Sequence, residues 1–284
     1  MNELSSSDFP HRLREIPDPP KKLYLEGTLP PEDHKWLTVV GSRKYTSYGK
    51  EVCERLIEGL RGYPVVVVSG LALGIDALAH RATLAAGLSC VGVPGSGLSP
   101  SVLHPASNRA LARDILSSGG ALLSEFEPDF RPTVWSFPQR NRIMAGLSDA
   151  VLIIEAEERS GTLITSRLAT EYNRDVLTVP HSIFSATGAG PHMLIKLGAT
   201  PITSSEDLLA ALGFDLTANC QKMTSAYSDC TPDEMKIIEL LKEPLSRDTL
   251  LEQLNLPINR ANALLSMLEL KGHIKESAGE IRLV

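Results

Sequence analysis

The feature that most limits the possible folds is an alternation, from Leu37 onward, of short apolar segments with stretches of helical periodicity. The apolar segments are rich in β-branched residues and are Leu37–Val40, Val65–Val68, Cys90–Val93, Ala121–Leu123, Val151–Ile154 and Val176–Val179. The helical stretches between them include Tyr48–Leu60, Ile75–Ala86, Asn108–Leu116 and Leu163–Tyr172. Strands that are apolar on both faces and alternate with helices indicate a parallel sheet covered on both sides. We therefore predict the α/β class, with a Rossmann-like doubly wound parallel sheet.

Composition divides the chain into segments. Residues 1–36 are rich in proline and charge and are predicted to form an extended N-terminal lead-in. Residues 37–213 carry the alternation and form the predicted Rossmann-like domain. Residues 214–230 are polar and lack periodicity, which is typical of a linker. Residues 231–284 begin with a helix-capping Thr-Pro pair and end in two alternating segments, and they predict a small C-terminal winged-helix-like domain.

The winged-helix-like domain has two possible roles. Winged helices often read duplex DNA with a basic recognition helix, which here would be Ala261–Lys271. That helix offers Lys271 beside Glu269, with Arg260 just before it, and residues 231–284 carry 7 Lys and Arg against 9 acidic residues. This balance favours a protein-contact or accessory role over recognition of duplex DNA.

Composition also excludes several classes of protein. The 284-residue chain has cysteines at 53, 90, 220 and 230, without Cys-x-x-Cys spacing, so we expect reduced thiols and no zinc site. Its start lacks the basic and apolar regions of an export signal, and no apolar run approaches the roughly 18–20 residues that span a bilayer. We therefore expect a cytoplasmic protein that does not enter membranes. The net charge of −6 excludes a broadly basic surface, so a nucleic-acid site must be a local concentration of positive groups.

Glycine-rich loops follow several of the predicted strands, at the edge where such sheets bind their ligands. Gly41–Lys44 is either an anion site or a tight turn with solvated charges. Ser69–Asp76 and Ser160–Thr162 open predicted helices, where free backbone amides and the helix dipole favour an anion, with Ser160 as the expected N-cap. Pro94–Gly97 adds flexible backbone. None of these loops is a Walker A site, and the Gly-x-Gly-x-x-Gly dinucleotide fingerprint is absent.

Two acidic residues have both a catalytic and a structural interpretation. Asp76 could form an acid–base pair with His80 one turn later, or it could cap a helix while His80 packs in the core. Glu155, which follows the fifth predicted strand, is either a catalytic acid or a member of a buried pair. Because the sequence has no metal-binding cluster, nucleophilic triad or Walker loop, we predict no catalytic residue, no metal ion and no cofactor.

The most specific segment is Phe137–Arg142, in which an aromatic residue stands close to two arginines. An aromatic ring can stack on a base while arginine holds phosphates, which is the minimum needed to bind a single strand. If Asn141 starts a helix, Arg140 and Arg142 point about 200° apart. We therefore assign Arg140 to a phosphate contact and Arg142 to an internal ion pair, with Glu155 as the candidate partner.

In this order the motifs resemble the DNA-processing protein A (DprA/Smf) family. The matching blocks are Pro20–Gly27, Gly41–Arg43, Ser69–His80, Ser124–Glu125, Phe137–Ser148, Glu155–Thr165 and Gly190–Ala199. They cover most of residues 20–213 without a break in order, which is more specific than any single motif. Gln139 departs from the family, which usually has a basic residue there, so one positive contact is missing.

The resemblance implies a protein that binds and protects incoming single-stranded DNA, forms a homodimer and helps load the RecA recombinase in natural transformation and DNA recombination. The DNA contacts that it implies are Ser42, Arg43, Gly70, Gly74, Phe137, Arg140, Asn141, Ser160 and Gly161. The implied dimer would use the late part of the Rossmann-like domain. There, Gly190–Leu212 has more apolar side chains than one short helix buries, and these either form an interface or pack in the core.

The competing function is enzymatic. Nucleotide-phosphate ribosidases have related Rossmann-like folds and would bind a mononucleotide at the same loops. Their Pro-Gly-Gly-x-Gly-Thr-x-x-Glu signature is missing, and only Ser160–Thr162 resembles part of it. We therefore predict a DNA-binding protein rather than an enzyme.

Overall fold

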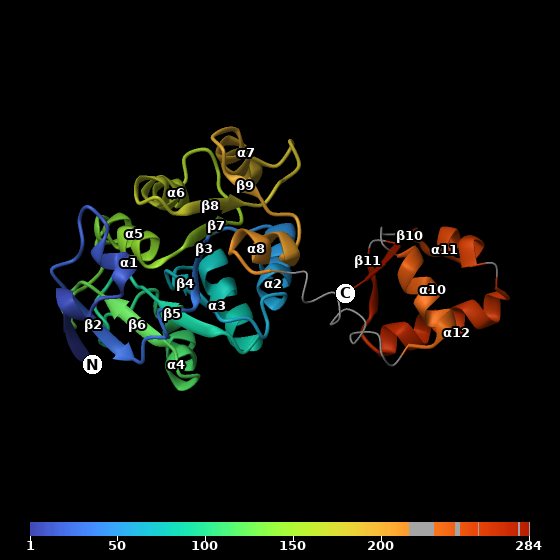
Figure 1. Ribbon diagram of the computed structural model, residues 1–284, viewed down its shortest axis with the longest axis horizontal. Helices are drawn as coiled ribbons and strands as arrows, with labels where there is room; N and C mark the ends of the chain where they lie inside the picture. The colour runs from blue at the N-terminus through green and yellow to red at the C-terminus, as the bar shows by residue number, and fades with distance from the viewer. Residues whose placement is uncertain (216–229, 242–244, 255, 278, 284) are drawn as a thin grey trace. The chain divides into compact units, whose positions relative to one another are not determined.

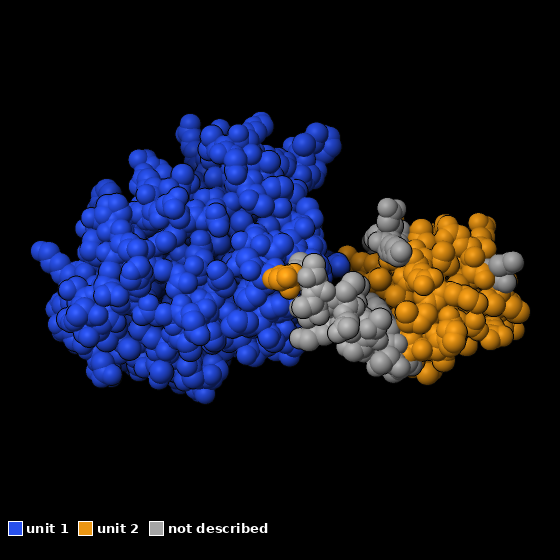
Figure 2. All heavy atoms as spheres, in the orientation of Figure 1, with its two compact units in different colours: residues 1–214 blue, residues 215–284 orange. Residues whose placement is uncertain are grey.

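The computed structural model describes residues 1–215, 230–241, 245–254, 256–277 and 279–283. The chain forms two compact units, residues 1–214 and residues 215–284, shown in different colours in Figure 2. The predicted linker, residues 214–230, lies mostly outside the described residues, since 216–229 are not among them.

The first unit is built on a nine-stranded sheet with the strand order β1-β2-β6-β5-β4-β3-β7-β8-β9 (Figure 1). The central strands are β3 (Lys35–Val40), β4 (Val65–Ser69), β5 (Ser89–Gly92), β6 (Ala121–Ser124), β7 (Ala150–Ile153) and β8 (Asp175–Thr178), with the short β9 (Thr200–Pro201) beside β8. From β3 to β9 each neighbouring pair is parallel. The chain starts this parallel part at β3, winds outward through β4 to β6, and then returns to β7 on the other side of β3. The predicted doubly wound parallel sheet is therefore confirmed.

Helices cover both faces of this sheet. One face packs against α1, α5, α6 and α7 and the other against α3 and α4, as the two buried apolar clusters of the unit show. The helices are α1 (His11–Arg14), α2 (Ser47–Glu58), α3 (Ile75–Ala85), α4 (Arg109–Ser117), α5 (Ser136–Leu147), α6 (Thr162–Glu171), α7 (Ala189–Lys196) and α8 (Ser205–Ala211). Short 3-10 turns occur at Ser6–Asp8, Ala106–Asn108 and Ala186–Gly188. Burying both faces explains why the strands are almost continuously apolar in sequence.

The N-terminal segment differs from the prediction, because residues 1–36 are part of the domain rather than an extended lead-in. Strand β1 (Asn2–Ser5) pairs with β2 (Lys22–Gly27), and β2 pairs antiparallel with β6. Between them Phe9 and Leu13 are buried in the core beneath the sheet. The prolines that suggested an extended chain lie in the connections outside these strands.

The second unit has the helices and strands expected of a winged helix. Helix α10 (Pro232–Leu240) begins with the predicted Thr231 cap, and α11 (Arg247–Leu254) and α12 (Ile258–Leu270) follow it. Strands β11 (Ile274–Ser277) and β12 (Glu280–Leu283) form the antiparallel pair, and β10 (Leu245–Ser246) adds to β12. Their apolar side chains form a core of their own.

The late part of the first unit mainly packs inward. Of the apolar side chains in residues 190–212, Leu194, Ile202, Leu208 and Leu209 are buried, and Leu197 is exposed. Most of the apolar side chains that could have formed a dimer interface in this segment therefore pack in the core. In the part of the chain that the structure describes, no helix has the length and apolarity to cross a bilayer.

His80 is a core residue of α3. Its side chain is fully buried, and its Nδ1 lies 3.0 Å from Cys90 Sγ on β5. Burial lowers the pKa of His80 from 6.5 to about 3, so the imidazole is neutral in the folded protein at ordinary pH. The structural interpretation of His80 is thus the one that the packing supports.

This burial predicts an acid-sensitive stability. Below pH 6.5 the unfolded chain binds a proton at His80 that the folded protein takes up only near pH 3. The contribution of neutral His80 to stability is therefore complete above pH 6.5 and falls by about 1.4 kcal/mol per pH unit below it. Urea unfolding of the wild type and of His80→Gln at pH 7.5, 6.5 and 5.5 measures this difference. Parallel pH dependence of the two proteins would contradict it.

Candidate functional site

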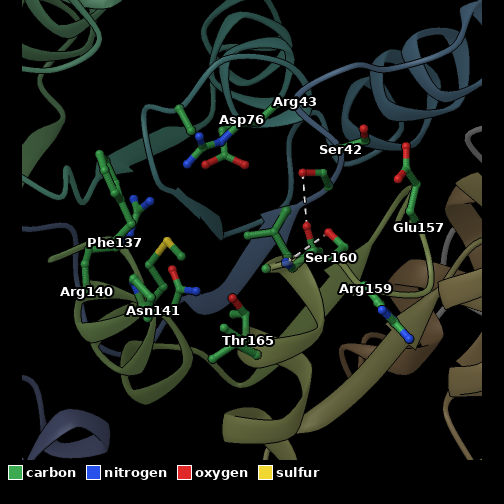
Figure 3. A pocket seen from close by; sticks show the side chains of 18 of the residues that line it. Ser42, Arg43, Asp76, Phe137, Arg140, Asn141, Glu157, Arg159, Ser160 and Thr165 are labelled. Carbon is green, nitrogen blue, oxygen red and sulfur yellow. Dashed lines mark hydrogen bonds between the residues drawn. The ribbon is translucent and has the colours of Figure 1, made fainter. Parts of the chain in front are cut away.

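An open cavity lies where the strand order reverses, between the loops that leave β3 and β7. It has a volume of about 640 Å³ and is open to solvent. Loop 41–44 after β3, the first turns of α5, and the loop from β7 into α6 form its walls (Figure 3). In doubly wound sheets this switch point is where ligands bind, because neighbouring loops leave toward opposite faces and open a crevice.

Most of the predicted site residues meet in this cavity. Those that line it are Ser42, Arg43, Phe137, Arg140, Asn141, Ser160 and Gly161. They come from parts of the chain separated by about a hundred residues, and the switch point brings them together. Gly70 and Gly74 are not among the lining residues.

Gly74 holds two loops together instead of facing the cavity. Its φ is +85°, and a β-carbon there would overlap Ser42 O and the Arg43 backbone. The Ile75 amide donates to Ser42 O at 3.1 Å, so this first amide of α3 already has a partner. The free amides predicted for the Ser69–Asp76 loop are thus partly used within the protein.

Asp76 organises the same loop. Its carboxylate accepts hydrogen bonds from the amides of Gly70, at 3.1 Å, and Ala72. Burial raises the pKa of Asp76, and the positive charge of Arg140 opposes that rise. Asp76 therefore stabilises the turn rather than pairing with His80, which bonds to Cys90 instead.

Arg140 is buried beneath the cavity. It is 4% exposed and donates a hydrogen bond to Val93 O. Burial lowers the pKa of Arg140 to about 10, so it stays charged at neutral pH. A β-carbon on Gly70 would overlap this guanidinium, which explains the glycine. Arg140 therefore lines the floor of the cavity, and most of its side chain is shielded from solvent.

Arg142 does form the predicted internal ion pair, but with different partners. It pairs with Glu125 and lies 3.5 Å from Asp18, which ties α5 to the N-terminal segment. The expected pairing with Glu155 is wrong. Helix α5 also begins earlier than supposed, at Ser136 instead of Asn141, although the two arginines do point in different directions.

Glu155 is a structural residue at the end of β7. It is fully buried and accepts hydrogen bonds from the Thr46 amide (2.9 Å), the Thr46 hydroxyl and the Thr187 hydroxyl (3.1 Å). A β-carbon on Gly49 would overlap it, so α2 approaches it closely. Glu155 thereby anchors the start of α2 and does not line the cavity.

Phe137 forms one wall of the cavity. The Arg43 guanidinium lies 5.4 Å from its ring centroid, and the His104 ring lies 5.8 Å away. The Phe137 ring also fills the space above Gly95, where a β-carbon would clash. A cation over an aromatic ring places a phosphate-binding group and a stacking surface side by side.

At the start of α6 the geometry differs by one residue from the prediction. Gly161 is the N-cap, and the Ser160 hydroxyl accepts a hydrogen bond from the Thr162 amide at 3.2 Å. A β-carbon on Gly161 would meet nothing within 4 Å, so there is room for a ligand beside this helix end.

Lys44, which belongs to the predicted Gly41–Lys44 loop, also lines the cavity. Several other lining residues are not expected from the sequence, namely Glu157, Arg159 and Thr165, together with the apolar Val134 and Met144. Arg159 could have been found, because it precedes the Ser160–Thr162 loop directly. With Arg43, Arg140 and Lys44 it gives the cavity more positive than negative groups, although the chain is negative overall.

Among the described residues, no group of three or more His, Cys, Asp and Glu side chains is arranged to hold a metal ion. Arg43 and Arg159 form no salt bridge with any residue that the structure describes. The cavity thus offers unpaired cations, an aromatic ring and hydroxyl groups, which suit an anionic ligand with flat bases.

Comparisons with known proteins agree with this geometry. Residues 2–213 match the family model DNA recombination-mediator protein A, and residues 221–280 match the DprA winged helix domain. The chain is 42% identical over 211 residues to Protein Smf of Escherichia coli and 40% identical over 211 residues to DNA processing protein DprA of Bacillus subtilis. These alignments cover 74% of this chain, 56% of the E. coli protein and 70% of the B. subtilis protein.

Two solved structures are also similar. DNA processing protein A from Streptococcus pneumoniae has 40% identity and a TM-score of 0.68, over 74% of this chain and 73% of that one. DNA processing protein A from Helicobacter pylori, studied for its unique single-stranded DNA binding mode, has 30% identity and a TM-score of 0.65, over 74% of this chain and 94% of that one. The chain therefore belongs to the DNA recombination-mediator protein A family and carries a DprA winged helix domain at its C-terminal end.

Proposed function

We propose that the cavity at the switch point binds single-stranded DNA and that the protein acts as a recombination mediator without catalytic turnover. In one open cavity, the Arg43 guanidinium lies over the Phe137 ring, and the start of α6 lines the same cavity. This arrangement is the observation that carries the proposal. The relative from H. pylori, whose single-stranded DNA binding mode has been studied, supports the ligand class.

We propose two roles for the site residues, according to whether they lie at the surface of the cavity or are packed beneath or beside it. Ser42, Arg43, Asn141, Ser160 and Gly161 reach the cavity surface and are proposed to contact the strand, with Phe137 stacking on a base. The remaining residues, Gly70, Gly74 and Arg140, are proposed to hold these contacts in place, since they are packed beneath or beside the cavity.

The wider role follows the family and is equally a proposal. We propose a cytoplasmic homodimer that protects incoming single-stranded DNA and helps load the RecA recombinase in natural transformation and recombination. The winged helix domain is proposed to have an accessory role, because its α12 exposes Leu270 and Met267 rather than a row of cations.

The proposal predicts the salt dependence of binding. Replacing Arg43 with alanine should weaken the binding of any single-stranded sequence and lower the slope of log K against log salt by about 0.7, the value for one phosphate contact on a single strand. Fluorescence anisotropy with labelled oligo-dT from 50 to 300 mM salt measures both. Arg113→Ala on α4 is the matched control, because Arg113 is also exposed but does not line the cavity.

Binding that is no tighter to oligo-dT than to a duplex of the same length would contradict the proposal. So would equal slopes for the wild type and Arg43→Ala, since the cavity would then contribute no ionic contact.

A further inference from the structure

The two tryptophans of the chain lie in opposite environments. Trp36 on β3 is 1% exposed, whereas Trp135, just before α5, is 80% exposed. Its neighbour Val134 is 79% exposed and lines the rim of the DNA cavity. An apolar ring that stays in water does not contribute the favourable free energy of burial to folding. Exposed apolar side chains at the rim of a site therefore commonly contact a ligand.

The turn that carries Trp135 is held firmly. Ser136 is buried, and its hydroxyl donates to Gly95 O at 2.6 Å and accepts from the Thr133 amide at 3.0 Å. The Ser136 amide donates in return to the Thr133 hydroxyl at 3.3 Å. This network fixes residues 133–136 against the loop after β5. The indole is thus exposed on a fixed backbone, so binding a ligand there does not also require the backbone to be ordered.

The position of Trp135 points to a nucleobase as its partner. It stands two residues before Phe137, whose ring faces the cavity and lies beneath the Arg43 guanidinium. A strand that leaves the cavity across Val134 reaches Trp135 next. Two apolar residues on one turn are too few for a stable protein interface, which buries about 800 Å² on each partner, but they match the face of one base.

We propose, given single-stranded DNA binding at the cavity, that Trp135 with Val134 forms an outer stacking subsite for a base adjacent to those held in the cavity. The subsite extends the binding site beyond the cavity without adding a phosphate contact. It therefore strengthens the binding of longer strands without changing the salt dependence.

The tryptophans themselves report on this subsite. Stacking of a base on the indole quenches its fluorescence, and Trp36 is shielded in the core. Titration with oligo-dT of 2 to 12 nucleotides should quench the wild-type emission only when the oligomer extends past the cavity. In Trp135→Phe the remaining emission comes from Trp36 and should not respond to any oligomer.

Affinity gives an independent test. Trp135→Ala should bind the longest oligomer about tenfold more weakly, with an unchanged salt slope, and the shortest within twofold of wild type. Trp135→Phe should retain most of the affinity, because a phenyl ring still stacks. Phe184→Ala is the matched control, since Phe184 is 92% exposed and does not line the cavity. Thermal melting checks that each variant is folded.

The outcomes separate the two proposals. If the wild type does not bind oligo-dT at any length, single-stranded DNA binding itself fails. If the wild type binds and Arg43→Ala weakens it, but tryptophan emission and the affinity of Trp135→Ala are unchanged at every length, the outer subsite alone is overturned. An equal loss at all lengths would also overturn it, because it would place Trp135 among the contacts of the cavity.

Discussion

Replacing Arg140 with alanine should lower the free energy of unfolding of the first unit by about 3–5 kcal/mol. Arg140 and Asp76 are 4% and 6% exposed, and the charge of each stabilises the other. Removing the cation takes away the more strongly acting of two positive charges near the buried Asp76 carboxylate, so that only that of Arg43 remains, and it leaves Val93 O without the Arg140 donor. Urea unfolding followed by circular dichroism measures the loss.

A double-mutant cycle tests the cause of this loss. Adding Asp76→Asn to Arg140→Ala should restore part of the stability, because the buried carboxylate charge is then removed as well. If Arg140→Ala instead unfolds at the wild-type urea concentration but no longer binds oligo-dT, Arg140 is a direct phosphate ligand, and its role beneath the cavity is misassigned.

Gly74→Ala should cost about 2–6 kcal/mol of folding stability and weaken DNA binding at the same time. The positive φ accounts for about 1–3 kcal/mol of backbone strain, and the overlap with Ser42 O adds a packing cost of similar size. The methyl group can be accommodated only if the Ser42–Arg43 backbone moves, and that backbone presents the Arg43 side chain to the cavity. Urea unfolding and anisotropy on the same protein measure both effects.

Gly87→Ala is the matched control for this substitution. Gly87 also has a positive φ, +70°, but a β-carbon there meets nothing within 4 Å. It should show the strain cost alone and leave DNA affinity unchanged. Equal losses of stability in the two variants would contradict a role for Gly74 in the close approach of the loops.

The parallel part of the fold could be predicted because its cause is local. A strand buried on both faces needs a continuous apolar run such as Val65–Val68, and the polar or glycine residue after it marks its end. The N-terminal strands could not be found in this way. β2 is stabilised by pairing with β6, about a hundred residues later, and the surrounding prolines mask its short apolar core.

Most of the predicted site residues line the cavity, but the packing of Gly70 and Gly74 could not be predicted from the sequence. Glycines after strands pointed to loops that bind anions, and the loops at Gly41 and Gly161 do reach the cavity. The roles of Gly70 and Gly74 depend on which distant atoms fill the space beside them, namely the Arg140 guanidinium and Ser42 O. Neighbours so far apart in sequence leave no local pattern. The sequence pattern also does not distinguish Glu125 from Glu155 as the partner of Arg142.

The pairing of β2 with β6 has a consequence for biosynthesis. Strand β2 is synthesised well before its partner strand β6, Ala121–Ser124. Arg174, whose side chain donates a hydrogen bond to the Arg12 carbonyl, is synthesised later still. At about 5–20 residues per second, the delay for β2 is roughly 5–20 s. During that interval Phe9, Leu13 and Leu23, all buried in the finished domain, lack the neighbours on β6 and α5 that share their apolar cluster. The nascent N-terminal segment therefore keeps apolar side chains exposed until β6 and α5 have been made.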